Sequence, residues 1–325
     1  MERCYISNPD ALLSIRKIQY TEGRAKGTEA FHITNAAGLD FTVLIDRAMG
    51  IGDLFYKGER ISFLTENGVV NPAYYEPEGT QWLRSFGGGF LATCGLDQVG
   101  EPCEGHGIHG RIDNIPAQQV CSRITEEDGV LYGEVSGVMR QTCHQGVSYE
   151  LRRTLRFCHN EAKITLTDTV VNVGEAEQPY MLLYHVNFGY PFLNPETRLE
   201  GEILSSQPAE PNTAANPDDF RVMPPMDGTV HDYLWLHKVK AEDDGMAEVR
   251  LTGKETEVTF RWSENELPNL AQWRRCVRGC YVMATEPTNT YVMGQDYERE
   301  KGTLQYLAPG EKRETKLEFT FESRK

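Results

Sequence analysis

The stretch that decides the fold is Tyr149-Glu150-Leu151-Arg152-Arg153-Thr154-Leu155-Arg156-Phe157. Apolar and polar side chains alternate along it, so that Tyr149, Leu151, Leu155 and Phe157 fall on one face. A period of two predicts a β-strand with one buried and one solvated face, which is the pattern of an antiparallel sheet.

The same alternation recurs along the chain, and turn signals separate its occurrences. Further strands are predicted at 39–46, 258–262 and 317–322, and turns at 35–38, 172–175 and 308–311. Glycine and asparagine supply the positive φ that tight turns need, and proline fixes the entry to a turn. Strands and turns without interleaved helices predict an all-β fold, namely a sandwich or a barrel.

Helical signals are few. Residues 11–17 form a short helical candidate, and 263–275 are predicted to hold a loop or a turn of helix. Residues 207–228 are rich in proline and are predicted to form an extended, irregular connection. Because alternating strands resume after this segment with the same character, we interpret it as a loop and expect a single domain spanning 1–325.

Composition limits the classes of partner. The 325 residues carry a formal net charge of −15, which argues against nucleic acid and anionic membranes as partners. No apolar run is long enough to span a bilayer, and the first residues do not resemble a signal peptide. The eight cysteines contain no CxxC pair, which argues against a zinc knuckle or a thioredoxin-like motif. Because no secretion signal is recognised, we expect free thiols and a cytoplasmic location.

A glycine-rich region stands out first as a candidate site. It comprises 84–91, with Gly87-Gly88-Gly89, and 105–111, with His106 and His109. Consecutive glycines allow the backbone to approach a ligand closely, but the motif of a phosphate loop is missing. The two histidines are three residues apart without an accompanying ligand set, so we expect no metal. A plain glycine-rich turn is the alternative.

Two apolar segments carry one titratable side chain each. His185 lies in the aromatic run 180–191, and Glu286 ends the apolar run 281–286 and precedes Pro287. A buried histidine and a desolvated carboxylate suit general acid and base work, provided that the fold brings them together. The alternatives are a core histidine with satisfied hydrogen bonds and an exposed glutamate at a turn.

At these residues the sequence resembles the aldose 1-epimerase (galactose mutarotase-like) superfamily, most closely an uncharacterised bacterial aldose 1-epimerase-like branch. The resemblance covers about 35 to 321 and implies a large antiparallel β-sandwich of the galactose mutarotase-like (supersandwich) type. The segments that carry it are Asp46-Arg47-Ala48-Met49-Gly50-Ile51, Phe86-Gly87-Gly88-Gly89-Phe90, Ile108-His109-Gly110-Arg111, Leu183-Tyr184-His185-Val186-Asn187 and Thr285-Glu286-Pro287.

The resemblance implies roles for individual residues. In such proteins a histidine followed by glycine binds the sugar, and His109 matches it. A histidine in an aromatic strand acts as general acid on the ring oxygen, which is the place of His185, and a glutamate near the C-terminus acts as general base on the anomeric hydroxyl, which is the place of Glu286. The usual asparagine–arginine pair has no clear copy here, and Arg84 is our substitute.

The remaining predicted sugar-binding residues are Arg111, Asn187, Trp273 and Asn289. Val186 stands where a proline often follows the histidine, and Pro287 replaces the usual threonine after the glutamate, so the substrate stays open. Trp273, Tyr190 or Trp82 could stack on the apolar face of the sugar, with plain core packing as the alternative for each and the favoured interpretation for Trp82.

The predicted function is therefore an aldose 1-epimerase that interconverts the anomers of a sugar without a cofactor or metal. The predicted partner is a small-molecule sugar, and a homodimer stays open. One alternative is a phosphorylated or acidic sugar clamped by Arg47, Arg84 and Arg111, because arginine binds such groups bidentately. Others are a non-catalytic sugar-binding or sensing protein on the same fold and a metal-dependent sugar isomerase.

Overall fold

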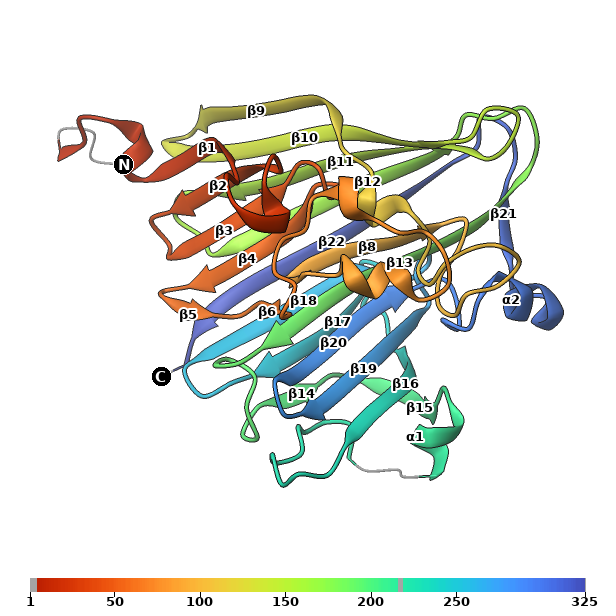
Figure 1. Cartoon of the computed structure of the whole chain (residues 1–325). Coiled ribbons are helices and arrows are strands. Elements are labelled where there is room, and N and C mark those ends of the chain that lie inside the picture. The colour runs from red at the N-terminus through yellow and green to blue at the C-terminus, as the bar shows by residue number, and fades with distance from the viewer. Residues whose placement is uncertain (1–4, 216–218, 325) are drawn as a thin grey trace.

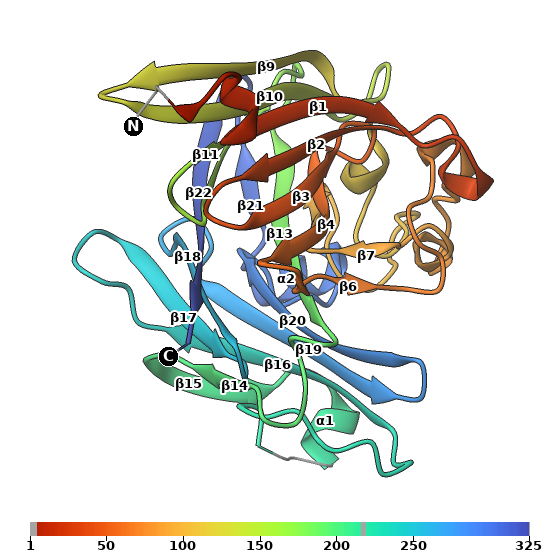
Figure 2. The ribbon, with the colours of Figure 1, turned by 90° about the vertical axis from the view of Figure 1, so that its left-hand side faces the viewer.

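The computed structural model describes residues 5–215 and 219–324. Two large antiparallel sheets of twelve and eight strands form the body of the molecule, with a two-stranded sheet and short helices beside them (Figure 1). Figure 2 shows the sheets from the side. This architecture confirms the predicted all-β sandwich.

The larger sheet contains β1 (Leu13–Gln19), β2 (Glu29–Asn35), β3 (Leu39–Leu44), β4 (Gly50–Tyr56), β5 (Glu59–Arg60), β8 (Leu91–Leu96), β13 (Gln178–Gly189), β15 (Ile203–Pro208), β16 (His231–Val239), β19 (Asn269–Val277), β20 (Cys280–Thr288) and β21 (Gln305–Leu307). Its order is β1-β2-β3-β4-β8-β13-β20-β19-β16-β15, with β5 paired to β4 and β21 paired to β13.

The smaller sheet contains β9 (Gln118–Glu127), β10 (Val130–Thr142), β11 (Ser148–Cys158), β12 (Lys163–Asn172), β14 (Arg198–Glu200), β17 (Met246–Thr252), β18 (Thr256–Ser263) and β22 (Lys312–Ser323). Its order is β14-β17-β18-β22-β12-β11-β10-β9. The two-stranded sheet pairs β6 (Phe63–Leu64) with β7 (Gly88–Gly89), and the α-helices are α1 (Pro211–Ala215) and α2 (Gln295–Lys301).

The main hydrophobic core lies between the two large sheets. Leu151, Leu155 and Phe157 of β11 are buried in it, and the Phe157 ring packs edge-on against Phe41 of β3 with centroids 5.5 Å apart. The alternation that predicted these strands therefore reports burial correctly. The strands predicted around 258–262 and 317–322 are likewise present, as β18 and β22.

Arg153 is the exception on the buried face of β11. Its guanidinium donates to both carboxylate oxygens of Asp168 on β12, at 2.9 and 2.6 Å, and to Thr93 Oγ1 on β8 at 2.8 Å. It also donates to the Ala48 carbonyl at 3.0 Å. Ala48 and Met49 have positive φ values of 49° and 53°. This network ties the two sheets together and holds the strained turn of the 46–51 segment.

Two local predictions of helix are wrong. Residues 13–17 of the helical candidate at 11–17 belong instead to β1, which pairs antiparallel with β2 over its full length, and Ala11 ends the 3-10 helix Pro9–Ala11. Within 263–275, the expected loop is present at 264–268, but no turn of helix follows, because 269–275 belong to β19, which pairs with both β16 and β20. Pairing with neighbouring strands overrides the weak local preference in both segments.

The proline-rich segment 207–228 follows the edge of the larger sheet. It contains α1, and Thr213 Oγ1 accepts a hydrogen bond from the Leu234 amide on β16 at 2.9 Å. Farther along, Arg274 of β19 donates to the Asp219 carbonyl at 2.7 Å. Pro217 lies outside the described residues. The described parts of this segment are an extended connection packed against β16 and β19, as predicted, except for the short helix.

β13 lies at the centre of the larger sheet, between β8 and β20, and is buried along almost its whole length. Leu182, Tyr184 and Val186 point into the main core. Leu183 points to the opposite face, where it joins a second apolar cluster under the loops that follow β6 and β8. Because side chains alternate along a strand, His185 shares that opposite face with Leu183.

Candidate functional site

The sheet register brings His185 and Glu286 together. Val186 of β13 pairs with Thr285 of β20, and Leu183 pairs with Thr288, so His185 stands opposite Glu286. His185 Nε2 lies 3.1 Å from Glu286 Oε1. Two residues that are far apart in sequence thus form one contact pair on the outer face of the larger sheet.

The β13–β20 ladder is interrupted at this pair. The registered pairs pass from Leu183–Thr288 to Val186–Thr285 and skip the two positions between them, one of which belongs to Pro287. Proline has no N–H to donate to a ladder and is rare in a central strand for that reason. The proline that departs from the family pattern therefore stands at the interruption of the ladder.

Burial keeps both side chains of the pair uncharged near neutral pH. The two residues are 4% and 1% exposed. Burial, and to a lesser degree the nearby His109 ring, lowers the pKa of His185 to about 3. Burial alone raises the pKa of Glu286 to about 8. The pair therefore holds one transferable proton on the carboxyl group instead of two opposite charges.

Aromatic rings enclose the pair. The His185 ring centroid lies 5.3 Å from that of Phe86, 5.9 Å from Trp273 and 6.5 Å from Trp82. Trp273 comes from β19, and its indole N–H donates to Asp232 of β16 at 2.9 Å. Such rings provide an apolar wall on which the C–H face of a sugar can pack. Phe86 was predicted only as part of a family motif, and no local signal marked it as lining the site.

His109 reaches the same place from the glycine-rich loop. It has a positive φ of 61° and a ring 5.9 Å from that of His185, edge to face. Its Nδ1 accepts from the Gly100 amide at 3.3 Å, so the proton of the neutral ring lies on Nε2. Burial lowers the pKa of His109 to about 4, so this ring is a neutral donor. His106 turns elsewhere, with Nδ1 3.8 Å from Asp97.

Asn187 lies two residues from His185 on the same face of β13. Its side-chain NH₂ group donates to the His185 carbonyl at 3.1 Å, and its Oδ1 has no hydrogen-bond partner among the described residues. The side chain of Asn289, in contrast, forms hydrogen bonds with the backbone of β13. Its oxygen accepts from the Leu182 amide at 2.7 Å, and its amide donates to the Tyr180 carbonyl at 3.1 Å.

The predicted arginines are not part of this cluster. The Arg84 side chain is 66% exposed and pairs with Glu76 at 3.3 Å, and Arg111 is also exposed. Arg47 is buried and forms an ion pair with Asp113 rather than with the neighbouring Asp46. Further bonds from Arg47 to the Val70 and Ser85 carbonyls, at 3.0 and 2.8 Å, leave it no free face for a phosphate.

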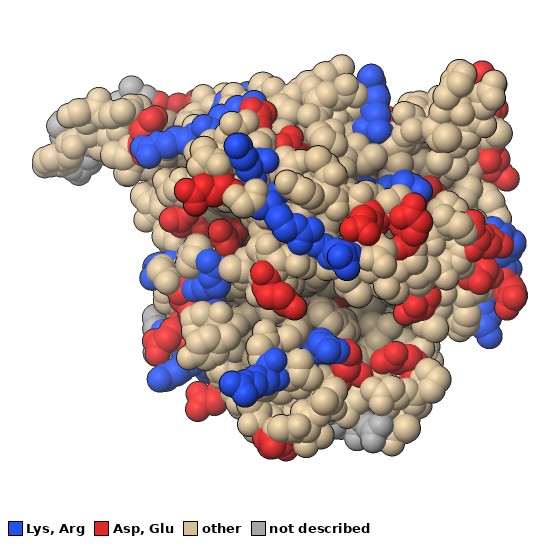
Figure 3. All heavy atoms as spheres, in the orientation of Figure 1, with Lys and Arg blue, Asp and Glu red and all other residues tan. Residues whose placement is uncertain are grey.

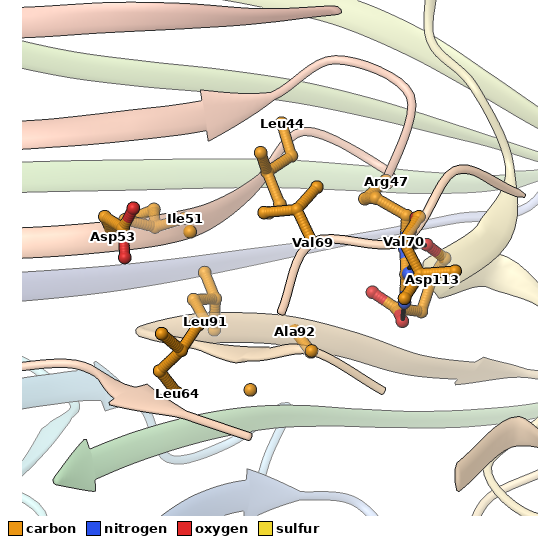
Figure 4. Close-up of a pocket in the computed structure, with 15 residues that line it drawn as sticks. Leu44, Arg47, Ile51, Asp53, Leu64, Val69, Val70, Leu91, Ala92 and Asp113 are labelled. Carbon is orange, nitrogen blue, oxygen red and sulfur yellow. Dashed lines mark hydrogen bonds and ion pairs between the residues drawn. The ribbon is translucent and has the colours of Figure 1, made fainter. Parts of the chain in front are cut away.

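Figure 4 shows Arg47 and Asp113 beside a small cavity next to β4 and β8. The cavity has a volume of about 30 Å³. A water needs about 10–15 Å³ by this measure, so the space suits one or two waters and not a sugar ring. This cavity therefore does not account for a sugar site, and His185 and Glu286 lie on the other face of the larger sheet.

Several buried polar atoms at the pair have no hydrogen-bond partner among the described residues. They are Trp82 Nε1, His185 Nδ1, Asn187 Oδ1 and Glu286 Oε1. Donors and acceptors are both present, and a ligand rich in hydroxyls can satisfy both kinds. Figure 3, in the orientation of Figure 1, shows a hollow near the centre of the molecule, with acidic and basic side chains mixed around it.

The described residues contain no group of three or more histidine, cysteine or acidic side chains arranged to hold a metal. In the same part of the chain, no helix is long and apolar enough to cross a membrane. The cysteines within it are free thiols.

Comparisons with known proteins agree on the fold. A protein from Klebsiella pneumoniae, named as a candidate aldose 1-epimerase, superposes with a TM-score of 0.89 at 22% identity, covering 97% of this chain and 86% of that one. A galactose mutarotase-like protein from Clostridium acetobutylicum gives 0.64 at 15% identity, covering 97% and 100%. A galactose 1-epimerase from Lactobacillus acidophilus gives 0.62 at 14% identity, covering 96% and 100%.

A search of curated proteins gave no match. A family model does match, over residues 25–321, and its description is "Domain of unknown function (DUF4432)". The fold is therefore the galactose mutarotase-like β-sandwich that the sequence predicted, and the chain belongs to the DUF4432 family.

Proposed function

We propose that this protein is an aldose 1-epimerase, which interconverts the α and β anomers of a free sugar. The observation that carries the proposal is the buried contact between His185 Nε2 and Glu286 Oε1 at 3.1 Å. The anomeric oxygen and the ring oxygen of an aldose are bonded to the same carbon. An acid and a base that serve these two oxygens must therefore stand side by side, as these two side chains do.

The reaction needs one proton donor and one proton acceptor. The base removes the proton from the C1 hydroxyl, a C=O bond forms at C1, and the C1–O5 bond breaks with its electrons moving to the ring oxygen. The acid protonates that oxygen. Rotation about C1–C2 and the reverse steps close the ring to the other anomer. Positioned acid and base groups each contribute roughly 10²–10⁴-fold to such steps.

A pair that holds a single proton can serve this reaction in both directions. In the ligand-free site the proton resides on Glu286, because burial raises its pKa to about 8 and lowers that of His185 to about 3. The roles implied by the family, with histidine as acid and glutamate as base, require the proton to reside on the histidine when sugar is bound. The two states differ only by transfer of that proton across the contact.

The surroundings of the pair favour a neutral sugar over a phosphorylated or acidic one. The side chains that touch the pair are aromatic or neutral, and His109 contributes an uncharged N–H. Arg47 is committed to Asp113, and Arg84 to Glu76. Burying an anion without a cationic partner is expensive, so phosphate at this position would be disfavoured.

The test is anomer exchange measured by NMR across neutral, acidic and phosphorylated aldoses. We expect the wild type to accelerate exchange of at least one neutral aldose, and Glu286→Gln and His185→Asn to reduce the rate by roughly 10²-fold or more. His237→Asn is the matched control, because His237 is equally buried but is bonded to Ser206 and Gln272. Sugar binding without exchange would instead establish a non-catalytic sugar-binding protein.

A further inference from the structure

Trp82 is buried although it belongs to a surface turn. It lies in the 3-10 helix Gln81–Arg84, whose next residue, Leu83, is 51% exposed, whereas Trp82 is only 2% exposed. The indole packs into the outer apolar cluster of the larger sheet, together with Phe86 and Leu183. The turn therefore places one large side chain directly over the face that carries the acid–base pair.

The indole ring contacts both histidines of the site. Its centroid lies 5.0 Å from the His109 ring, edge to face, and 6.5 Å from the His185 ring. On its other side it stacks on Phe86 at 4.5 Å with an interplanar angle of 23°. Stacking on Phe86 fixes the plane of the indole and hence the direction of its N–H.

That N–H has no acceptor among the described residues. The indoles of Trp262 and Trp273 donate to the Leu267 carbonyl at 3.1 Å and to Asp232 at 2.9 Å. A buried tryptophan N–H usually has such a partner, since leaving it unpaired is costly. The His185 ring next to Trp82 also has an unpaired Nδ1, and together with the free indole N–H this indicates a ligand with hydroxyl groups.

We propose that Trp82 determines sugar specificity, its indole N–H donating a hydrogen bond to one hydroxyl of the bound aldose. This proposal rests on the proposed function. It gives Trp82 a role in binding, whereas the sequence alone favours plain core packing for this residue. Phe86 supports the indole, and His109 stands beside it as a second donor. The hydroxyl that accepts from Trp82 then fixes the orientation of the ring relative to the acid–base pair.

Trp235 offers a matched control on the same sheet. It is also buried, and its N–H also has no partner among the described residues. However, its neighbours Leu234 and Leu236 belong to the outer cluster, so Trp235 points to the opposite face, where it packs against Phe220 at 5.8 Å. Replacing either tryptophan by phenylalanine removes one unpaired N–H and keeps an aromatic ring, but only Trp82 faces the site.

The experiment compares Trp82→Phe and Trp235→Phe with the wild type, using D-glucose, D-galactose and their monodeoxy derivatives. We expect Trp82→Phe to raise KM and Kd about 2- to 12-fold, as the loss of one neutral hydrogen bond does, and Trp235→Phe to leave both unchanged. One deoxy sugar should bind the wild type more weakly by the same factor and bind Trp82→Phe no worse than its parent sugar does.

A second readout does not depend on catalysis. With ¹⁵N-labelled tryptophan, the indole signal of Trp82, assigned by its loss in Trp82→Phe, should shift on titration with the sugar, and that of Trp235 should not. A shift without anomer exchange would retain the Trp82 assignment and refute the epimerase. Exchange with an unmoved Trp82 signal and an unchanged KM would refute the Trp82 assignment alone. No binding of either sugar would overturn both.

Discussion

Replacing Glu286 by glutamine should remove a pH-dependent loss of stability. Burial raises the pKa of this carboxyl from 4.5 to about 8 in the folded protein. Between those two values the folded state retains the proton and the unfolded state has released it. The folded state then binds more protons than the unfolded one, so the free energy of unfolding falls as pH rises. Glutamine has the same shape and carries no such proton.

The magnitude follows from the linkage relation. One bound proton corresponds to about 1.4 kcal/mol per pH unit, so raising the pH from 5 to 7 should cost the wild type about 2.5 kcal/mol through this group, since the unfolded carboxyl is still partly protonated at pH 5. The stability of Glu286→Gln relative to the wild type should therefore increase by that amount over the same range. Burial also lowers the pKa of His185, but both proteins carry that histidine beside a neutral side chain, so its contribution cancels in the difference.

Urea unfolding monitored by tryptophan fluorescence at pH 5, 6 and 7 measures this difference. Glu300→Gln, which removes an exposed carboxyl from α2, is the control for the loss of one negative charge from the surface. Its effect should be small at every pH, as for other exposed substitutions. A stability difference between Glu286→Gln and the wild type that is equal at pH 5 and pH 7 would refute the reasoning, since it would mean that the carboxyl is already ionised in the folded protein.

Three other predictions test the site and its support. The value of kcat/KM for anomer exchange should fall as pH rises through about 8, because Glu286 then loses the transferable proton of the pair; a rate that rises in proportion to ionisation of this carboxyl would contradict the shared-proton state. Arg153→Met should destabilise the protein by about 3–5 kcal/mol in urea unfolding, because it leaves Asp168 buried without its cation; a loss below about 1 kcal/mol would show that the pair is dispensable. Gly100→Ala should weaken both stability and sugar binding, because its Cβ would collide with a backbone carbonyl at a φ of 86°, whereas Gly105→Ala, at a φ of 85° in open space, should cost only about 1 kcal/mol; equal effects of the two changes would refute the steric argument.

The strands of the fold were readable from sequence because most of them face water on one side. Alternation in 149–157 reports the burial of β11 directly, apart from Arg153, whose partners come from three other segments. The sequence of 11–17 predicts a helix, whereas most of it lies in β1. This strand is a largely exposed edge strand, so its apolar and polar residues do not alternate clearly. Where a strand is stabilised by hydrogen bonds to its neighbour rather than by burial, its sequence shows little of the apolar–polar alternation that identifies strands.

Part of the candidate site is likewise predictable from the sequence, and part depends on the fold. A histidine and a glutamate inside apolar runs are visible in sequence, but only the register of β13 and β20 makes them a pair. Trp82 and Arg84 show the opposite case. They are two residues apart on one short 3-10 turn, and the direction of that turn decides that the tryptophan faces the site and the arginine faces solvent. No local pattern in 81–84 contains that direction, because it is set by packing against Phe86 and His109.

Buried polar groups lie on both sides of β13, but only those on one side have their hydrogen bonds satisfied. In the main core, Asp168 accepts from Arg153 and Tyr184 and is fully satisfied, as expected of a structural network. On the outer face, one strand position away, His185 and Glu286 are buried without hydrogen bonds that satisfy them, beside a proline that interrupts the ladder. Each of these features costs stability. Replacing Glu286 by glutamine, which has the same shape and no ionisable proton, would remove part of that cost. Local violations that a fold retains at such a cost are typical of functional sites, where the unsatisfied groups are kept for a ligand. The contrast between the two faces therefore supports a ligand-binding role for the outer one independently of any resemblance to known epimerases.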